Sequence, residues 1–312
     1  MTSVLVTGGA GFIGSHLAEG MVKRRIRTRV LDNFSTGNRD NLAGIDGIEI
    51  FEGDVGDMNA LHEAMDGIDI VFHLAALPSV SKSVLDPVHS NTVNLDGTVK
   101  VLLAAKDAGV QKVVYAGSSS AYGDSEALPK LESMRECPIS PYAVNKMAGE
   151  KYCSVFSSVY GIETVVLRYF NVFGPRQDPS SHYSGVISSF IQKLLNGQRP
   201  VVYGDGEQTR DFVFVGNVVM ANIFASVSRV GGGEIFNIAM GERVSINELL
   251  EIIRELVGAT GIKPIYREAR KGDPKHLLAD IGKAQKAFGY WPVVGLREGL
   301  KITVDWYKQR LK

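Results

Sequence analysis

Short apolar runs alternate with helical patterns in the first half of the chain. The runs that predict strands lie at 4–6, 28–31, 48–51, 70–74, 113–116 and 164–169. Helices are predicted between them at 12–23, 58–65, 94–108 and 142–160. The run at 70–74 is almost entirely apolar, which indicates a strand buried on both faces. Because such alternation forms parallel βαβ units, we predict an α/β fold with a doubly wound parallel sheet.

The alternation breaks after Asn171. Glycine-rich turns separate shorter elements, and further helices are predicted at 246–256, 281–288 and 296–310. We therefore predict a doubly wound domain over residues 1–171 and a smaller α/β lobe over residues 172–312. The lobe is expected to pack on the carboxyl ends of the strands, with some of its segments returning to the first domain.

A glycine-rich loop joins the first predicted strand to the first predicted helix. Gly9, Gly11 and Gly14 fit the pattern G-x-G-x-x-G, and Gly8, Gly11 and Gly14 fit the wider G-x-x-G-x-x-G spacing. Such a loop turns tightly, lets the backbone approach a pyrophosphate, and directs N–H groups of the helix N-terminus at it. Because Asp32 ends the second strand, where a ribose-binding carboxylate belongs, the loop predicts a Rossmann dinucleotide site.

Asp32 also bears on which dinucleotide binds. Its carboxylate can accept hydrogen bonds from ribose hydroxyls but would repel the 2′-phosphate of NADP. Arg39 is the nearest cation in the following loop, and the stretch 33–37 lies closer to the strand end. We therefore expect NAD.

Tyr142 and Lys146 are four residues apart on a predicted helix, so their side chains share one face. A free tyrosine has a pKa of about 10 and is a poor base at neutral pH. A neighbouring ammonium, together with the positive nicotinamide ring, would stabilise the phenolate and lower this pKa. By itself the spacing also fits a packed tyrosine beside a solvated lysine. The serine run 118–120, at the end of a buried strand, favours the catalytic interpretation, because its hydroxyls could bond the reacting oxygen.

Several longer motifs together resemble one family over essentially the whole chain. They are TGGAGFIGSHL at 7–17, HLAA at 73–76, SSSAYG at 118–123, SPYAVNK at 140–146, RYFNVFGPRQ at 168–177, GDGEQTRDFVFV at 204–215 and GDPKHLLAD at 272–280. The sequence resembles the extended short-chain dehydrogenase/reductase family and looks most like its UDP-sugar 4-epimerases.

The resemblance implies a catalytic trio of Ser118, Tyr142 and Lys146, with Tyr142 as the base. The residues expected at NAD are Gly8, Gly11, Phe12, Ile13, Gly14, Asp32, Asn33, Ser35, Thr36, Gly37, Asp54, Val55, Leu74, Ala75, Ala76, Asn94, Tyr142 and Lys146. Family epimerases place a lysine in the loop after HLAA, where this chain has Pro78, and Lys82 nearby is not assigned that role.

Ser119 and Ser120 help to predict the reaction. Related 4,6-dehydratases carry an Asp-Glu pair there, and UDP-glucuronate decarboxylases carry a Glu at the position of Ser120. Hydroxyls cannot do that acid–base work near neutrality, so both reactions are disfavoured. We expect oxidation at C4 of a UDP-hexose, rotation of the 4-keto sugar and return of the hydride. The expected pairs are UDP-glucose/UDP-galactose and also UDP-GlcNAc/UDP-GalNAc. A UDP-glucuronate 4-epimerase, a nucleotide-sugar reductase and a non-catalytic NAD-sensing protein are the alternatives.

The second lobe supplies cations for a diphosphate. Arg210 and Arg270 resemble the diphosphate-binding arginines of the epimerases, and guanidinium groups bind phosphate oxygens bidentately. At the position that limits sugar size in the family stands Leu277, which is smaller than the tyrosine that excludes N-acetylated sugars. The residues expected at the substrate are Ser118, Ser119, Ser120, Tyr142, Asn171, Val186, Tyr203, Arg210, Arg270, Asp273 and Leu277.

Composition adds mainly exclusions. The chain has 312 residues and balances 34 Lys and Arg against 34 Asp and Glu, so no net charge favours nucleic acid or an anionic membrane. Two cysteines cannot form a disulfide framework, and the six histidines show no metal-ligand spacing. The first strand begins at Ser3, so we expect no signal peptide and a cytoplasmic protein. Helices 94–108 and 142–160 resemble those that pair in family homodimers, so a homodimer is expected.

Overall fold

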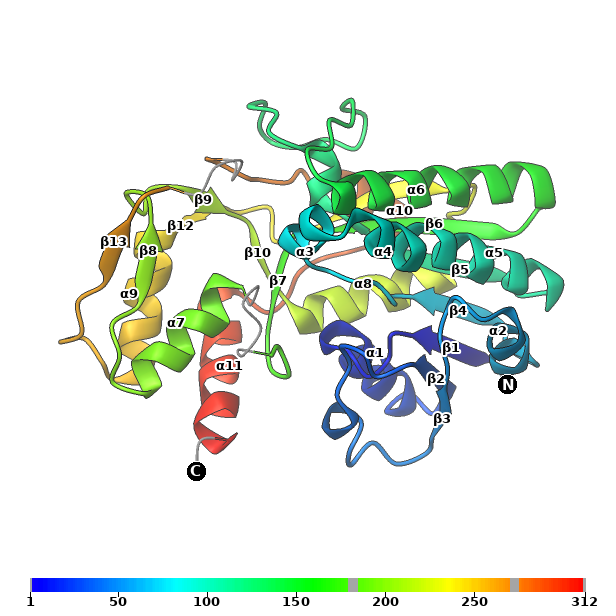
Figure 1. Cartoon of the computed structure of the whole chain (residues 1–312), viewed down its shortest axis with the longest axis horizontal. Coiled ribbons are helices and arrows are strands. Elements are labelled where there is room, and N and C mark those ends of the chain that lie inside the picture. The colour runs from blue at the N-terminus through cyan, green and yellow to red at the C-terminus, as the bar shows by residue number, and fades with distance from the viewer. Residues whose placement is uncertain (1, 179–184, 270–274, 311–312) are drawn as a thin grey trace.

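The computed structural model describes residues 2–178, 185–269 and 275–310. Its largest element is a seven-stranded parallel sheet with the strand order β11-β6-β5-β4-β1-β2-β3 (Figure 1). The strands are β1 (Ser3–Thr7), β2 (Arg27–Asp32), β3 (Ile48–Glu52), β4 (Ile70–His73), β5 (Lys112–Ser118), β6 (Glu163–Tyr169) and β11 (Glu234–Ile238). The strand order reverses between β1 and β4, which is where α/β sheets bind ligands at the carboxyl ends of their strands. The predicted doubly wound fold is confirmed.

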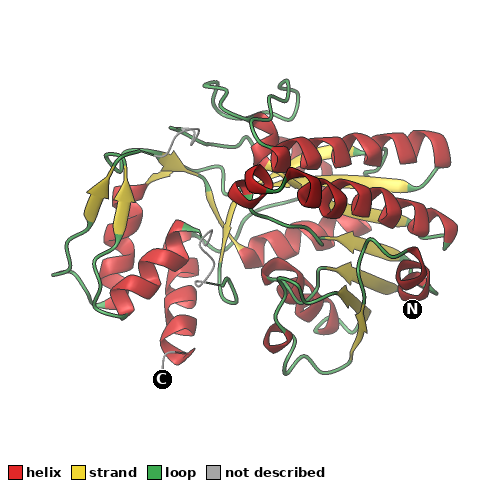
Figure 2. Cartoon of the chain, in the orientation of Figure 1, coloured by secondary structure: helices red, strands yellow, loops and turns green. Residues whose placement is uncertain are grey.

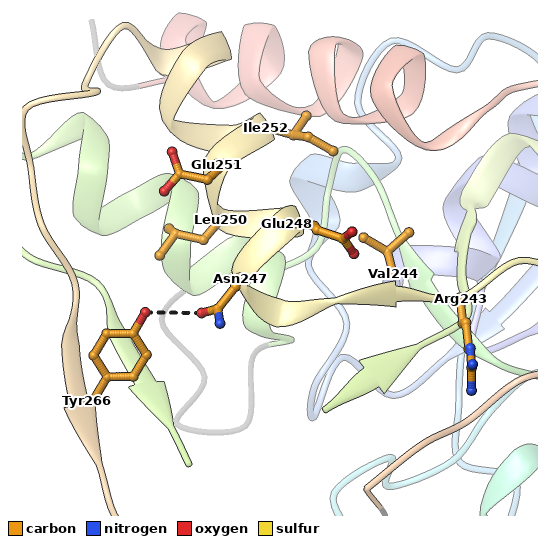
Figure 3. A pocket seen from close by; sticks show the side chains of 8 residues that line it. All are labelled: Arg243, Val244, Asn247, Glu248, Leu250, Glu251, Ile252 and Tyr266. Atoms are coloured by element: carbon orange, nitrogen blue, oxygen red, sulfur yellow. Dashed lines mark hydrogen bonds between the residues drawn. The ribbon is translucent and has the colours of Figure 1, made fainter. Parts of the chain in front are cut away.

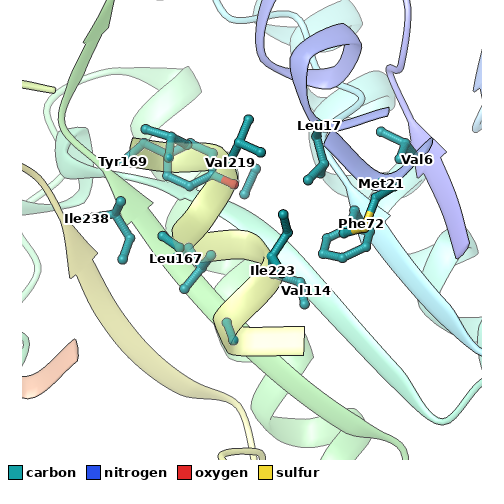
Figure 4. Packing of buried hydrophobic residues seen from close by; sticks show 14 of the residues in the cluster. Val6, Leu17, Met21, Phe72, Val114, Leu167, Tyr169, Val219, Ile223 and Ile238 are labelled. Carbon is teal, nitrogen blue, oxygen red and sulfur yellow. The ribbon is translucent and has the colours of Figure 1, made fainter. Parts of the chain in front are cut away.

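Helices cover both faces of this sheet because its strands are apolar on both sides. On one face, Leu17 and Met21 of α1 (Phe12–Val22) and Ile223 of α8 (Val215–Val227) pack on strand residues such as Val6 and Phe72 (Figure 4). The other face is covered by α2 (Met58–Met65), α5 (Gly97–Asp107) and α6 (Pro141–Tyr160). Helix α10 (Gly282–Phe288) packs beside β11.

A second group of helices and short strands extends from the carboxyl side of the sheet (Figures 1 and 2). Its apolar core includes Phe190 from α7, Leu249 and Ile253 from α9, and Leu300 from α11. The helices are α7 (Val186–Leu195), α9 (Ile246–Val257) and α11 (Leu296–Arg310). The strand pairs are β7 (Asn171–Phe173) with β10 (Phe212–Phe214), β8 (Val201–Tyr203) with β13 (Ile265–Arg267), and β9 (Thr209–Arg210) with β12 (Val244–Ser245).

Several parts of the chain differ from the predicted elements. Helices α7 and α8 lie where no helix was predicted. Strand β11 comes from the second half of the chain and extends the large sheet by pairing with β6, although no strand was predicted there. Before α5, the chain forms the short helices α3 (Val80–Leu85) and α4 (Pro87–Asn91) and the π-helical turn η2 (Thr92–Asp96). Side chains of Ser79 and Asp86 accept hydrogen bonds from the first turns of α3 and α4 and so start them. In the part of the chain that the structure describes, no helix has the length and apolar character needed to span a bilayer.

Candidate active site

The glycine loop between β1 and α1 leaves no room for side chains. Gly8 has a φ of +69°, and a Cβ there would lie 2.7 Å from the backbone nitrogen of Ala75. A Cβ at Gly14 would lie 2.2 Å from the carbonyl oxygen of Gly8. Gly11, at the start of α1, has no side chain to occupy the N–H groups of the first turn. The loop therefore forms a backbone cradle that suits a pyrophosphate at a helix N-terminus.

Asp32 holds the neighbouring loop in place. Its carboxylate accepts one hydrogen bond from the backbone N–H of Ala10 and one from that of Phe34, each at 2.8 Å. Asn38 donates its backbone N–H to the Ala10 carbonyl at 3.0 Å, so the loop after β2 folds back on the glycine loop. Ser35, Thr36 and Gly37 lie in this loop, where Ser35 and Thr36 are exposed. The guanidinium of Arg39 stacks 3.8 Å from the ring centroid of Phe34 and pairs with a glutamate.

Other predicted NAD residues lie at the same edge of the sheet. The side-chain amide of Asn33 donates to Asp54 at 2.5 Å, just beyond the end of β3. Asn94 lies in the π-helical turn, and its side chain makes two hydrogen bonds with the backbone of Leu77. It accepts the Leu77 N–H at 2.7 Å and donates to the Leu77 carbonyl at 3.2 Å. π-helical turns are frequent at functional sites. The remaining predicted residues belong to the start of α1 and to the ends of β3 and β4: Phe12, Ile13, Val55, Leu74, Ala75 and Ala76.

The predicted catalytic side chains meet between β5 and α6. Ser118 ends β5, and its hydroxyl is close enough to the Tyr142 hydroxyl to influence the pKa of that phenol. Ser118 also accepts the backbone N–H of Ser120 at 3.2 Å and its hydroxyl at 2.9 Å. Lys146 donates its Nζ to the carbonyl of Ala116 at 2.9 Å. Strand β5 and helix α6 therefore bring the serine, tyrosine and lysine to one place.

The pKa directions describe the contribution of the chain itself. Burial raises the pKa of Tyr142, and the neighbouring Ser118 hydroxyl acts against that rise. Burial also lowers the pKa of Lys146 to about 8, and the Glu150 carboxylate acts against that change. The chain alone therefore does not lower the pKa of Tyr142, because the desolvation of the phenol outweighs the other effects. The expected lowering of the Tyr142 pKa also requires the positive charge of the nicotinamide ring, so it applies to the site with NAD bound.

The predicted substrate residues come from separate segments of the second lobe. Asn171 begins β7, and its side-chain oxygen is buried without a hydrogen-bond partner among the described residues. Val186 begins α7, and Tyr203 ends β8. Arg210 lies in β9, is 8% exposed and donates to the Thr209 carbonyl at 2.9 Å. The predicted Arg270 and Asp273 lie outside the described residues.

Leu277 lies in an apolar cluster beside the serine turn. This cluster consists of Tyr122, Phe170, Ala239, Leu277 and Ala279. Leu277 also donates its backbone N–H to the carbonyl of Thr209 at 3.1 Å, which links its segment to the strand of Arg210.

Comparisons with known proteins agree with this arrangement. The model of the NAD dependent epimerase/dehydratase family matches residues 4–239. The chain belongs to this family. It is 38% identical over 313 residues to the UDP-glucose 4-epimerase of Mycolicibacterium smegmatis, covering 98% of both chains. The family is NAD dependent, and the cradle at Gly8 and Gly14 fits that cofactor.

Two solved structures of such enzymes superpose closely. The UDP-N-acetylglucosamine 4-epimerase of Methanobrevibacter ruminantium, in complex with UDP-N-acetylmuramic acid, has a TM-score of 0.95 at 40% identity over 99% of both chains. The UDP-glucose 4-epimerase of Thermotoga maritima, with UDP-glucose, has a TM-score of 0.94 at 36% identity over 100% of both chains. The predicted resemblance to UDP-sugar 4-epimerases is confirmed.

Two further serines, which the sequence motifs did not indicate, hold α6 and the cofactor edge together. Ser83 in α3 accepts the backbone N–H of Tyr142 at 3.1 Å. Ser90 in α4 accepts from the side chains of Asn94 at 3.2 Å and Asn145 at 3.3 Å, so it links the cofactor edge to α6. Both serines lie on helices that were not predicted, and the caps at Ser79 and Asp86 were the available signal.

A groove lies away from these residues, between α9 and β13 (Figure 3). It is lined by Arg243, Val244, Asn247, Glu248, Leu250, Glu251, Ile252 and Tyr266. The Tyr266 hydroxyl donates to Asn247 at 3.1 Å across it. Among the predicted site residues that the structure describes, none lines this groove, so it is separate from the glycine cradle and from Ser118, Tyr142 and Lys146.

Proposed function

We propose that this protein is an NAD-dependent UDP-sugar 4-epimerase that interconverts UDP-glucose and UDP-galactose and also the N-acetylated pair. The observation that carries the proposal is the meeting of Ser118, Tyr142 and Lys146 beside a dinucleotide cradle. The similarity to 4-epimerases that act on UDP-glucose and UDP-N-acetylglucosamine supports the same conclusion.

In this mechanism Tyr142 exchanges a proton with the hydroxyl at C4 of the sugar. NAD, when bound, supplies the acceptor and later the donor of the hydride at that carbon. Ser118, whose hydroxyl lies near that of Tyr142, would hydrogen-bond the reacting hydroxyl and share its proton. Lys146 adds positive charge, which favours the phenolate over the neutral phenol. With the cofactor bound, the hydride would return to the other face of the 4-keto sugar, so no external oxidant or reductant would be consumed.

The serine turn limits what else can happen to that 4-keto sugar. Ser119 and Ser120 stand in a short 3-10 turn, η3 (Ser119–Tyr122), and present hydroxyls rather than carboxyl groups. Elimination of water at C5 and C6 needs an acid and a base, and a serine hydroxyl is neither near neutral pH. Epimerisation is therefore favoured over dehydration or decarboxylation.

The UDP group is assigned to the second lobe. Arg210 and Arg270 would bind the diphosphate, and Asp273 would bind the uridine ribose. Val186 and Tyr203 would contact the nucleotide. The buried oxygen of Asn171 supports a substrate contact, because an unpaired buried acceptor is costly and a ligand hydroxyl can satisfy it. Leu277 would lie beside the sugar and leave more space there than a tyrosine would.

The deciding experiment is incubation of the purified protein, without added NAD, with UDP-glucose, UDP-N-acetylglucosamine and UDP-glucuronate in separate reactions. Chromatography that resolves the C4 epimers is expected to detect UDP-galactose and the N-acetylated epimer. Epimerisation of UDP-glucuronate alone, or consumption of free NADH with a single reduced product, would contradict the proposal. The Tyr142→Phe variant is the matched inactive control.

We also infer a cytoplasmic homodimer that pairs through α5 and α6. Exposed apolar side chains lie on both helices, and the spacing of those on α6 puts them on one face. They are Leu103, Val144, Tyr152, Val155 and Val159, which are 37–64% exposed. Light scattering should give twice the chain mass for the wild type and the chain mass for Val155→Asp. A wild type with the mass of one chain would contradict the inference.

A further inference from the structure

Asp211 connects three separate segments of the second lobe. It lies between β9 and β10, where the chain passes between the large sheet and the lobe (Figure 1), and its side chain is fully buried. Its carboxylate accepts backbone N–H groups from Met240 at 2.8 Å, Gly241 at 3.1 Å and Ala279 at 3.2 Å. Hydrogen bonds to an ionised acceptor are the strong ones, so this carboxylate ties the loop after β11 to the segment around Ala279.

Three residues of the proposed substrate site lie on segments that adjoin or contact Asp211. Arg210 directly precedes Asp211, and Leu277 lies two residues before Ala279. The backbone N–H of Asn171 donates to the Asp211 carbonyl at 3.2 Å. The main chain and carboxylate of one residue therefore contact the segments of three proposed substrate contacts.

We propose that Asp211 is a positioning residue that holds Arg210, Asn171 and Leu277 in the arrangement that binds a nucleoside diphosphate sugar. The inference rests on the proposed function, since it concerns the same site. Asp211 itself is buried behind these residues and acts through them. Removing the carboxylate's charge weakens three hydrogen bonds at once and leaves buried N–H groups poorly paired, which lets the segments shift.

The positioning depends on Asp211 being ionised. Burial raises the pKa of Asp211 to about 6, although the three backbone N–H groups act against that rise. Glu242 also raises it, and the other ionisable groups packed around this region are Tyr290, Arg210 and His276, which is bonded to Thr209. The carboxylate is a full acceptor above this pH and gains a proton as the pH falls through about 6. Substrate binding should therefore weaken on the acid side.

The test compares Asp211→Asn with Asp69→Asn. Asp69 accepts the backbone N–H of Ser3 at 2.8 Å at the opposite edge of the sheet, so its variant loses a similar bond far from the substrate. At pH 8, calorimetry with UDP and kinetics with UDP-glucose are measured. We expect Asp211→Asn to raise the Kd of UDP and the KM about tenfold, with kcat and bound NAD unchanged within about twofold. Asp69→Asn should change none of these quantities.

A second measurement uses the wild type alone. Its KM for UDP-glucose, whose phosphates do not titrate in this range, should rise as the pH falls from 8 to 5.5, and this rise should be absent in Asp211→Asn. The proposal is overturned if Asp211→Asn loses stability and NAD but keeps a normal Kd and KM. If that variant does not fold, a flat wild-type KM profile overturns it instead. A wild type that binds UDP without epimerising any sugar would refute the proposed function, yet the UDP measurement would still test Asp211.

Discussion

The cofactor cradle and the proposed substrate side of this molecule are built in different ways. The cofactor cradle is one continuous stretch from β1 into α1, completed by loops that close on it with backbone contacts at Ala10 and Ala75. The substrate side is assembled from segments as far apart as Asn171 and Leu277, which are joined by single hydrogen bonds. Steric exclusion therefore defines the first region, whereas a network of polar contacts defines the second. The cofactor cradle should not tolerate added side-chain atoms, whereas substitutions on the substrate side should weaken binding by degrees.

The largest effect is expected where the two regions meet, at Tyr142. Replacing Tyr142 by Phe removes the hydroxyl that lies beside Ser118 but keeps the ring. We expect kcat to fall by about 10²–10⁴-fold, the usual contribution of a positioned acid–base group. Bound NAD, measured by absorbance after denaturation, and the Kd of UDP should be unchanged. An undiminished kcat would show that the substrate does not react at the Tyr142 hydroxyl.

The cofactor side can be broken with one methyl group. Gly14→Ala would place a Cβ 2.2 Å from the Gly8 carbonyl oxygen, and backbone cannot move aside cheaply. We expect NAD retention to fall by about 10–100-fold, since overpacking costs about 1–3 kcal/mol. Gly261→Ala is the matched control, because a Cβ there meets nothing within 4 Å. Equal NAD contents in both variants would refute the steric account of the cradle.

The substrate side is probed by Arg210→Lys, which keeps the charge and removes the planar fork. A lysine cannot reproduce bidentate phosphate binding, so KM for UDP-glucose should rise about tenfold with bound NAD unchanged. Arg243→Lys serves as the control, because Arg243 is exposed in the same lobe and lines the separate groove. If both variants raised KM equally, the rise would not depend on a bidentate diphosphate contact at Arg210.

The same contrast explains what the sequence could predict. The glycine loop was predictable because its backbone constraints lie within eight consecutive positions, Thr7 to Gly14. Helices with regular apolar spacing were also located well, and the predicted range 296–310 coincides with α11. Strand β11 was missed because its partner β6 lies far away in sequence, so nothing local marks the pairing. Asp211 was missed for the same reason, since its role lies in contacts with residues 240, 241 and 279.

The smallest effect concerns a contact beneath Lys146, the proposed catalytic lysine. The Nζ of Lys146 lies 4.9 Å from the ring centroid of Tyr115, a cation–π distance, and Gly149 makes room for that tyrosine. A Cβ at Gly149 would lie 2.4 Å from the Tyr115 hydroxyl oxygen. Gly149→Ala should therefore shift the ring and Lys146 with it, lowering kcat by about threefold to tenfold while leaving KM unchanged.

The closest contact in Gly149→Ala is with the hydroxyl of Tyr115, so removing that hydroxyl should relieve part of the clash, although the added Cβ would still lie 2.8 Å from the ring carbon Cζ. The double variant Gly149→Ala/Tyr115→Phe keeps the ring under Lys146 and should regain part of the lost kcat, while Tyr115→Phe alone should stay near the wild type. A double variant no better than Gly149→Ala would mean that the added methyl acts on α6 directly rather than through the ring. Recovery would instead mean that Tyr115, in β5, sets the position of Lys146. The sheet that builds the cofactor cradle would then also position this lysine.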